Sequence, residues 1–227
     1  MPRERARSIA AAFSPRHPLG NRHDYYYSRS KLGSDPLYPG VCDALRGSTV
    51  PLLDLGCGLG LLAHALRADG IDLPYRGVDN DRGKVARARD AAQDLADIAF
   101  EHVDLAAPDF SLDALGHRGS IAILDVLQFI PPEAQDRTLD AAIAMLAPGG
   151  RLVIRTGLDD GGARARVTRA VDVLSKLLGW MNAGPTRYPD ADALRARFDG
   201  AGLVSEFTPL YGKTPFNNWR VVASKPG

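Results

Sequence analysis

Short apolar runs alternate with helix-type patterns of apolar and polar residues along the middle of the chain. Each run is bounded by polar or turn residues, which is typical of strands buried on both faces. Strands that alternate with helices favour a parallel, doubly wound sheet. The predicted strands begin at Leu52 and continue as Tyr75–Asp79, Ile98–Val103 and Ile121–Leu124, with a fifth opening within Leu146–Ile154.

The residues on either side of this alternation are predicted to belong to the same domain. Residues 1–48 are expected to form a helical extension that covers the substrate, with helices near Arg5–Phe13 and Tyr38–Leu45. No Gly/Pro-rich linker divides the chain, so we expect one domain over residues 1–227. The remaining predicted elements are helices over Ala163–Trp180 and Asp190–Asp199 and strands over Leu203–Thr208 and Trp219–Ala223.

The segment Leu52–Gly60, L-L-D-L-G-C-G-L-G, carries the strongest functional signal. Its three glycines follow a buried strand directly and precede a helical pattern. Glycine tolerates positive φ and has no Cβ, so a ligand can approach the backbone closely. A dinucleotide-binding G-x-G-x-x-G turn would place its third glycine at position 61, which is Leu61. The acidic residue Asp54 is also foreign to that fingerprint.

Further motifs follow the glycine turn in order. They are Y-R-G-V-D ending at Asp79, Asp104-Leu105, Asp125 after the fourth strand, and L-A-P-G-G-R-L-V-I over 146–154. Together these pieces resemble the class I S-adenosylmethionine (SAM) dependent methyltransferases. The resemblance implies SAM as cofactor. It also implies a Rossmann-like α/β sheet of seven strands in the order 3-2-1-4-5-7-6, with the last strand antiparallel.

Most candidate cofactor residues fall at strand ends, where ligands bind in open α/β sheets. Asp79 stands 23 positions after Gly56, a spacing typical of an acid that accepts from ribose hydroxyls. The resemblance implies that Asp104 and the Leu105 backbone contact adenine, and that Arg29 or Lys31 pairs with the SAM carboxylate. The predicted cofactor-binding residues are Asp54, Gly56, Cys57, Gly58, Asp79, Asn80, Asp104, Leu105, Asp125 and Arg29.

Three segments resemble a narrower group, the small-molecule methyltransferases that accompany fatty-acyl and aryl-polyene pigment biosynthesis genes. They span 25–38, 125–132 and 209–219. That group has a histidine after Asp-Val-Leu, whereas this chain has Gln128. We expect the first and third segments to meet Gln128 in one pocket above the methyl group. The predicted acceptor-binding residues are Tyr25, Tyr26, Phe216, Asn217 and Trp219.

The chemistry of methyl transfer limits what the catalytic residues must do. SAM carries the reactivity, so the protein mainly orients the reactants. A carboxylate acceptor needs no base, whereas a phenol, with a pKa of about 10, profits from one. Glutamine positions a hydroxyl but does not take its proton. The predicted catalytic residues are therefore Gln128, which orients the acceptor, and His23, a base beside the tyrosines; no metal is predicted.

Composition indicates the kind of acceptor and the cellular compartment. The net charge is +1 and no basic stripe is evident, which disfavours nucleic acid and favours a small-molecule acceptor. Only two cysteines occur, Cys42 and Cys57, which indicates a reducing, cytoplasmic compartment. No apolar run reaches the roughly 18 residues that a membrane span requires. The oligomeric state is left open.

Three alternatives remain beside small-molecule methylation. A nucleic-acid methyltransferase usually has its Asn/Asp-Pro-Pro-aromatic motif directly after the fourth strand, but Pro131-Pro132 stand six residues beyond Asp125. A regulator that binds SAM without catalysis would keep the same motifs. A metal-dependent variant would use Asp125, Asp159 and Asp160, although the D-D-G-G sequence there favours a turn.

Overall fold

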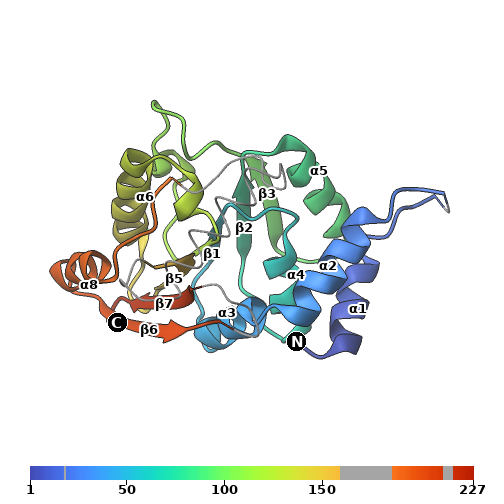
Figure 1. Cartoon of the computed structure of the whole chain (residues 1–227), viewed down its shortest axis with the longest axis horizontal. Helices are drawn as coiled ribbons and strands as arrows, with labels where there is room; N and C mark the ends of the chain where they lie inside the picture. Colours follow the sequence, from blue (N-terminus) through green and yellow to red (C-terminus); the bar gives the residue numbers. More distant parts are fainter. Residues whose placement is uncertain (18, 159–185, 212–216) are drawn as a thin grey trace.

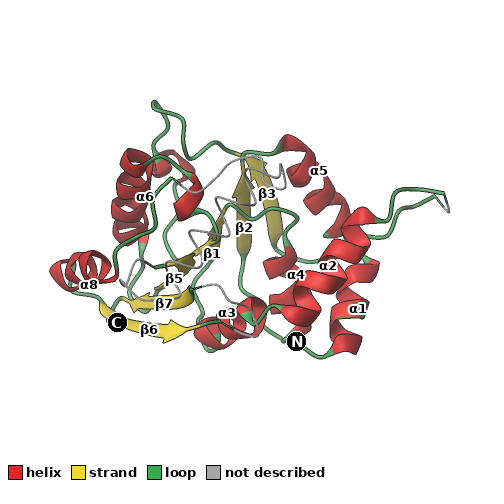
Figure 2. Ribbon diagram, viewed as in Figure 1, coloured by secondary structure: helices red, strands yellow, loops and turns green. Residues whose placement is uncertain are grey.

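The computed structural model describes residues 1–17, 19–158, 186–211 and 217–227, which form a seven-stranded sheet between layers of helices (Figure 1, Figure 2). The strand order β3-β2-β1-β4-β5-β7-β6 confirms the prediction. Strands β1 to β5 are parallel, and β7 runs antiparallel to both of its neighbours. The strands are β1 Leu52–Leu55, β2 Tyr75–Asp79, β3 Ile98–His102, β4 Ser120–Leu124, β5 Arg151–Gly157, β6 Val204–Pro209 and β7 Asn218–Ser224.

Two apolar cores lie on opposite faces of the sheet, because successive strand residues point in opposite directions. Leu52 of β1 packs in one core with the N-terminal helices, and its neighbour Leu53 packs in the other with α6 and α8. The same alternation holds for Ile121 and Ala122 in β4. Burial on both faces explains why these strands read as continuous apolar runs in the sequence.

The described helices match most, but not all, of the predicted ones. The helix His23–Ser34 was not predicted, and the predicted helix Ala163–Trp180 lies outside the described residues. The helices are α1 Arg3–Ala11, α2 His23–Ser34, α3 Leu37–Leu45, α4 Leu61–Ala68, α5 Arg82–Ala91, α6 Pro132–Met145 and α8 Ala191–Gly200, with short 3₁₀ turns η1 Leu112–Leu115 and η2 Leu127–Phe129. None of the described helices is long and apolar enough to cross a membrane.

The N-terminal extension consists of three helices rather than the two that were expected. Helices α1 and α2 pack on each other, and α3 contacts α4, β5 and β7 (Figure 1). Asp35 links α2 to α3, because its side chain accepts a hydrogen bond of 2.9 Å from the Leu37 backbone N–H. This bond fixes the turn between α2 and α3, and the ion pair of Asp35 with Arg155 of β5 joins the turn to the sheet.

Candidate functional site

The glycine turn joins β1 to α4 in a conformation that needs glycine. Gly56, Gly58 and Gly60 all have positive φ, between 57° and 80°. A Cβ on Gly56 would lie 2.2 Å from a methyl group of Val126, which follows β4. A Cβ on Gly58 would meet nothing within 4 Å. The turn is therefore packed tightly against the next strand end but leaves open space above Gly58.

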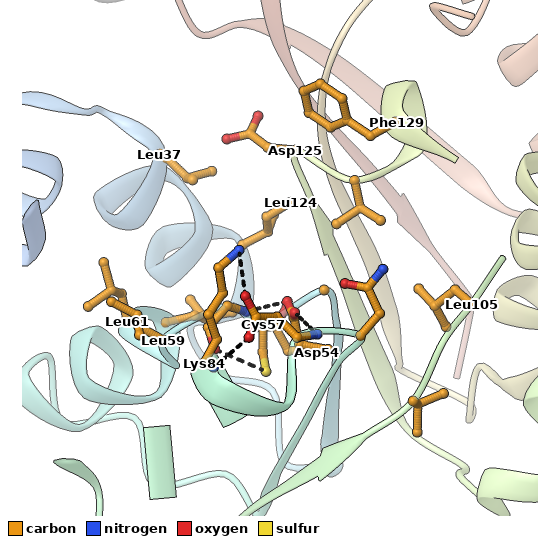
Figure 3. Close-up of a pocket in the computed structure, with 18 of the residues that line it drawn as sticks. Leu37, Asp54, Cys57, Leu59, Leu61, Lys84, Leu105, Leu124, Asp125 and Phe129 are labelled. Carbon is orange, nitrogen blue, oxygen red and sulfur yellow. Dashed lines mark hydrogen bonds and ion pairs between the residues drawn. The ribbon is translucent and has the colours of Figure 1, made fainter. Parts of the chain in front are cut away.

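That open space belongs to a cavity of about 810 Å³ at the carboxyl ends of β1, β2, β3 and β4 (Figure 3). The glycine turn and the strand ends form one wall, and α2 and α3 form the other with Tyr27, Lys31, Leu37 and Tyr38. Nine of the ten predicted cofactor residues line it, namely Asp54, Gly56, Cys57, Gly58, Asp79, Asn80, Asp104, Leu105 and Asp125.

Asp79 ends β2 and is held in place by the backbone. Its two carboxylate oxygens accept hydrogen bonds from Gly58 N–H at 2.8 Å and from Asp81 N–H at 2.9 Å. Each carboxylate oxygen can accept a second hydrogen bond, so Asp79 retains acceptor capacity for a ligand hydroxyl. Asp104, after β3, accepts from the Ala106 N–H at 2.9 Å and also lines the cavity.

Asp54 is buried beneath the glycine turn. The Tyr75 hydroxyl donates to its Oδ2 at 2.5 Å, while Oδ1 has no hydrogen-bond partner within the described residues. Burial raises the pKa of Asp54 to about 7; the Tyr75 hydrogen bond opposes this shift and the Asp79 charge adds to it. A buried carboxyl with a free oxygen and a raised pKa favours a cationic ligand, which would stabilise its ionised form.

Asp125 follows β4 directly and has a left-handed backbone conformation, with a φ of 61°. Its carboxylate pairs with Arg155 of β5 and lies 3.6 Å from the Lys31 ammonium. Asp35 completes the cluster, 2.8 Å from Lys31 and 3.5 Å from Arg155. Burial alone would lower the pKa of Lys31, but the Asp125 and Asp35 charges outweigh it and raise that pKa. Lys31 therefore presents a cation to the cavity.

The tyrosine segment contributes to the cavity through a different residue from those predicted. Tyr27 lines the cavity, whereas Tyr25 and Tyr26 do not, and Tyr26 is 56% exposed. His23 begins α2 with an exposed ring that contacts Asp24 at 3.3 Å and does not line the cavity. Arg29 is likewise exposed and away from the cavity wall.

Tyr38 lines the cavity and lies in the predicted segment 25–38, although it was not among the residues selected as acceptor-binding. Its side chain is buried, and its hydroxyl forms no hydrogen bond with another described residue. Burial raises the pKa of Tyr38 well above its ordinary value, and the charges of Tyr27 and Asp125 add to the shift. Tyr38 thus stays a neutral phenol that can donate to a ligand.

Gln128 lies in η2 and is buried, but it does not line this cavity. Its Oε1 accepts a hydrogen bond of 3.0 Å from the Thr156 hydroxyl, and its backbone oxygen accepts from Thr186 N–H at 2.7 Å. The residues that follow it, Phe129 and Ile130, do line the cavity. Gln128 therefore does not face the cavity. It anchors the η2 turn, whose neighbouring residues Phe129 and Ile130 do.

The C-terminal candidate residues lie at the same edge of the sheet, because β7 starts opposite the end of β5. Asn217 is buried and donates to the Leu158 backbone oxygen at 2.8 Å, and it accepts from the Trp219 indole at 3.2 Å. Neither side chain lines the cavity. Phe216, Asp159 and Asp160 lie outside the described residues.

Comparisons with known proteins agree with this site. Residues 53–152 match the family described as "Methyltransferase domain". A carboxy-S-adenosyl-L-methionine synthase of Chromohalobacter salexigens is 36% identical over 104 residues, which cover 44% of this chain and 37% of that protein. A ubiquinone biosynthesis O-methyltransferase of Psychrobacter arcticus is 27% identical over 106 residues, 46% of this chain and 40% of that one. The chain thus spans about two fifths of these relatives' length.

Solved structures agree at the level of the fold. The magnesium protoporphyrin IX methyltransferase of Synechocystis PCC 6803, solved with bound SAH, superposes with a TM-score of 0.59 at 18% identity. The match covers 98% of this chain and 93% of that one. The fold is therefore Rossmann-like, as in this methyltransferase, and residues 53–152 are similar to a methyltransferase domain. These matches indicate SAM as the cofactor.

The cavity residues fit this cofactor. SAM carries a cationic sulfonium and ammonium, a carboxylate and two ribose hydroxyls. Asp54 and Asp79 offer acceptors to the cations and hydroxyls, and Lys31 offers a cation to the carboxylate. The space above Gly58, which a Cβ would enter, allows the ligand to approach the backbone.

Proposed function

We propose that the chain transfers a methyl group from SAM to an oxygen of a small phenolic or carboxylic acceptor. One observation supports this most. The helical wall of α2 and α3 carries two phenols, Tyr27 and Tyr38, and the apolar Phe129 and Ile130 line the cavity from the turn after β4. Such a wall suits a small aromatic or unsaturated acceptor better than a phosphate backbone.

In this proposal the chain orients both reactants and excludes water. Bound SAM supplies an electrophilic methyl group. Asp79 holds the ribose, and Lys31 holds the carboxylate of the amino-acid half. The neutral Tyr38 hydroxyl donates to the acceptor and keeps its attacking oxygen directed at the methyl group. Gln128, the residue first selected for this task, acts on the acceptor through the η2 turn that it anchors to Thr156.

The acceptor determines whether a base is required. A carboxylate attacks without one. His23, the predicted base, is exposed at the start of α2 and does not line the cavity, which does not favour it as a base for a phenol acceptor. We therefore favour a carboxylate or an already ionised phenol. The narrower assignment, to an acyl or aryl-polyene pigment pathway in the cytoplasm, rests on the resemblance of residues 25–38, 125–132 and 209–219.

The proposal is tested by methyl transfer to a defined panel. Wild-type protein is incubated with methyl-labelled SAM and with phenolic, hydroxybenzoic and polyenoic acids, each paired with its neutral alcohol or amide. We expect label in ester or ether products with at least one acid and little with the neutral partners. Label in nucleic acid, or no transfer to any acceptor by protein that binds SAM, would contradict the proposal.

Gln128→Ala refines the assignment within the same assay. Removing the amide frees Thr156 and loosens η2, so we expect kcat/KM to fall by about ten- to a hundredfold, since a misplacement of about 1 Å can cost about a hundredfold. SAM affinity should stay within a factor of two, because Gln128 does not line the cofactor wall. An unchanged rate would remove Gln128 from the site.

A further inference from the structure

Charge is distributed very unevenly along the chain. Residues 1–31 contain seven lysines and arginines and two acidic residues, a net charge of +5, whereas the whole chain carries +1. Helix α5 adds four basic residues and one acidic residue. All the remaining residues together are therefore clearly acidic. A neutral total conceals a strongly basic region.

The basic residues share one side of the molecule. Helices α1 and α2 pack together, Arg87 of α5 pairs with Asp24 of α2 at 2.8 Å, and Arg16 donates to Gln93 beyond α5. Figure 1 shows α1, α2 and α5 together at one end, away from α6 and α8. We call this the basic face; its exposed cations are Arg3, Arg5, Arg7, Arg16, Arg22, Arg29, Arg82, Lys84, Arg87 and Arg89.

The basic face also holds exposed apolar side chains. The described residues have four exposed large hydrophobic side chains, and three of them, Leu19, Tyr26 and Tyr27, lie on it. Leu19 is 90% exposed in the loop between α1 and α2, which projects from the body of the molecule (Figure 1). Arg16 and Arg22 flank this leucine in the sequence. An apolar tip between arginines, backed by tyrosines, is the composition of an interfacial anchor.

We propose that the basic face docks on an anionic lipid surface, with Leu19 entering the headgroup region and the flanking arginines contacting lipid phosphates. Several arginines near an anionic leaflet each add to binding, and one shallow apolar insertion strengthens it. A nucleic-acid backbone would use the arginines but not Leu19. Docking on lipid does not depend on the proposed function. Because Tyr27 also lines the cavity, docking would bring the cavity mouth close to the lipid surface.

Vesicle co-sedimentation of the full chain tests this proposal. The probes are phosphatidylglycerol/phosphatidylcholine vesicles, pure phosphatidylcholine vesicles and soluble heparin, at about 0.1 M and about 1 M salt. We expect sedimentation with the anionic vesicles at low salt, and little with neutral vesicles or at high salt. Arg22→Gln should lower partitioning by about fivefold, and Leu19→Ser by about tenfold.

Matched variants separate docking from general attraction to anions. Arg137→Gln removes an exposed arginine from α6, at the opposite end of the molecule, and should leave partitioning unchanged. Leu19→Ser should leave heparin binding unchanged. Absence of sedimentation with anionic vesicles would overturn the proposal. So would sedimentation that Leu19→Ser does not alter, since the face would then be a general polyanion site.

Discussion

The two walls of the cavity are built in different ways. The wall that holds the cofactor consists of a glycine turn and strand ends, and two of its acids, Asp79 and Asp104, accept hydrogen bonds from backbone N–H groups. The opposite wall consists of side chains on the short helices α2 and α3, held to the sheet by the charge cluster of Lys31, Asp35, Asp125 and Arg155. The first wall follows from topology, whereas the second depends on individual side chains.

This difference separates cofactor recognition from acceptor recognition. A parallel sheet brings its strand ends to one edge whatever the side chains are, so the cofactor wall can be common to many proteins. The helical wall has no such constraint. Substitutions on the two walls should therefore differ in how much they weaken binding and in which ligand they affect. Four measurements test this expectation.

The largest effect is expected at the glycine turn. Gly58→Val should abolish SAM and SAH binding, by at least about a hundredfold in calorimetric Kd, because the branched side chain enters the cavity from a backbone with φ of 57°. Gly70→Val is the matched control, since Gly70 also has positive φ and open space but follows α4 away from the site. If both variants bind SAM like the wild type, the cofactor wall is misassigned.

A smaller loss is expected at Asp79. Asp79→Ala should weaken SAH binding by about 1.5–3 kcal/mol, the range for hydrogen bonds to charged groups. The 2′-deoxy analogue of SAH serves as the partner in a double-mutant cycle. Direct contact predicts that the analogue binds wild type weakly and loses little more in the variant. Equal losses for both ligands would mean that Asp79 only supports the Gly58 turn.

Lys31 and Arg29 both lie on α2 but give different expectations, because only Lys31 lines the cavity. Lys31→Met should weaken SAH binding by about tenfold, as loss of one partly screened charged hydrogen bond would, and leave methylthioadenosine, which lacks the carboxylate, unaffected. Arg29→Met should change neither ligand's affinity. Thermal unfolding of both variants controls for damage to the charge cluster. The reverse result would mean that Arg29, and not Lys31, binds the cofactor carboxylate.

The smallest effect concerns pH. Because the pKa of Asp54 is raised to about 7, its carboxyl is mostly neutral at about pH 6 and mostly ionised at about pH 8. A cationic cofactor binds the ionised form better, so SAM affinity should rise a few-fold over this range. The same shift makes folding less favourable as pH rises from about 4 to 7.

Asp54→Asn should remove this pH dependence of binding, when it is measured by calorimetry at each pH. His64 does not interfere, because burial lowers its pKa to about 4, below the range. A pH profile that is the same in the variant and the wild type would assign the titration to the ligand.

The sequence predicted the cofactor wall well because its signals are local and topological. Glycine spacing, strand-end acids and strand order are each readable without knowing any packing. The helical wall was less predictable. Residues 23–34 have no apolar stripe, with only Ser28 and Leu32 buried, so α2 was missed. Because the helix was not predicted, Arg29 and Lys31 were equal candidates for binding the SAM carboxylate. On a helix, a separation of two residues turns their side chains about 200° apart.

Gln128 illustrates a second limit. After β4 the chain enters a 3₁₀ turn, in which consecutive side chains point in different directions. Motif position alone did not show that Phe129 and Ile130 would line the cavity while Gln128 turned towards Thr156. The partner that decided the direction lies on β5, 28 residues away.

The antiparallel insertion of β7 has a consequence for synthesis of the chain. Strand β5 pairs with β4 on one side, but its other side pairs along its whole length with β7. Until residues 218–224 leave the ribosome, β5 is an open edge with buried-type residues such as Val153 and Ile154. Unprotected apolar edges invite pairing between nascent chains. The emerging protein should therefore need a chaperone most during the interval between translation of β5 and translation of β7.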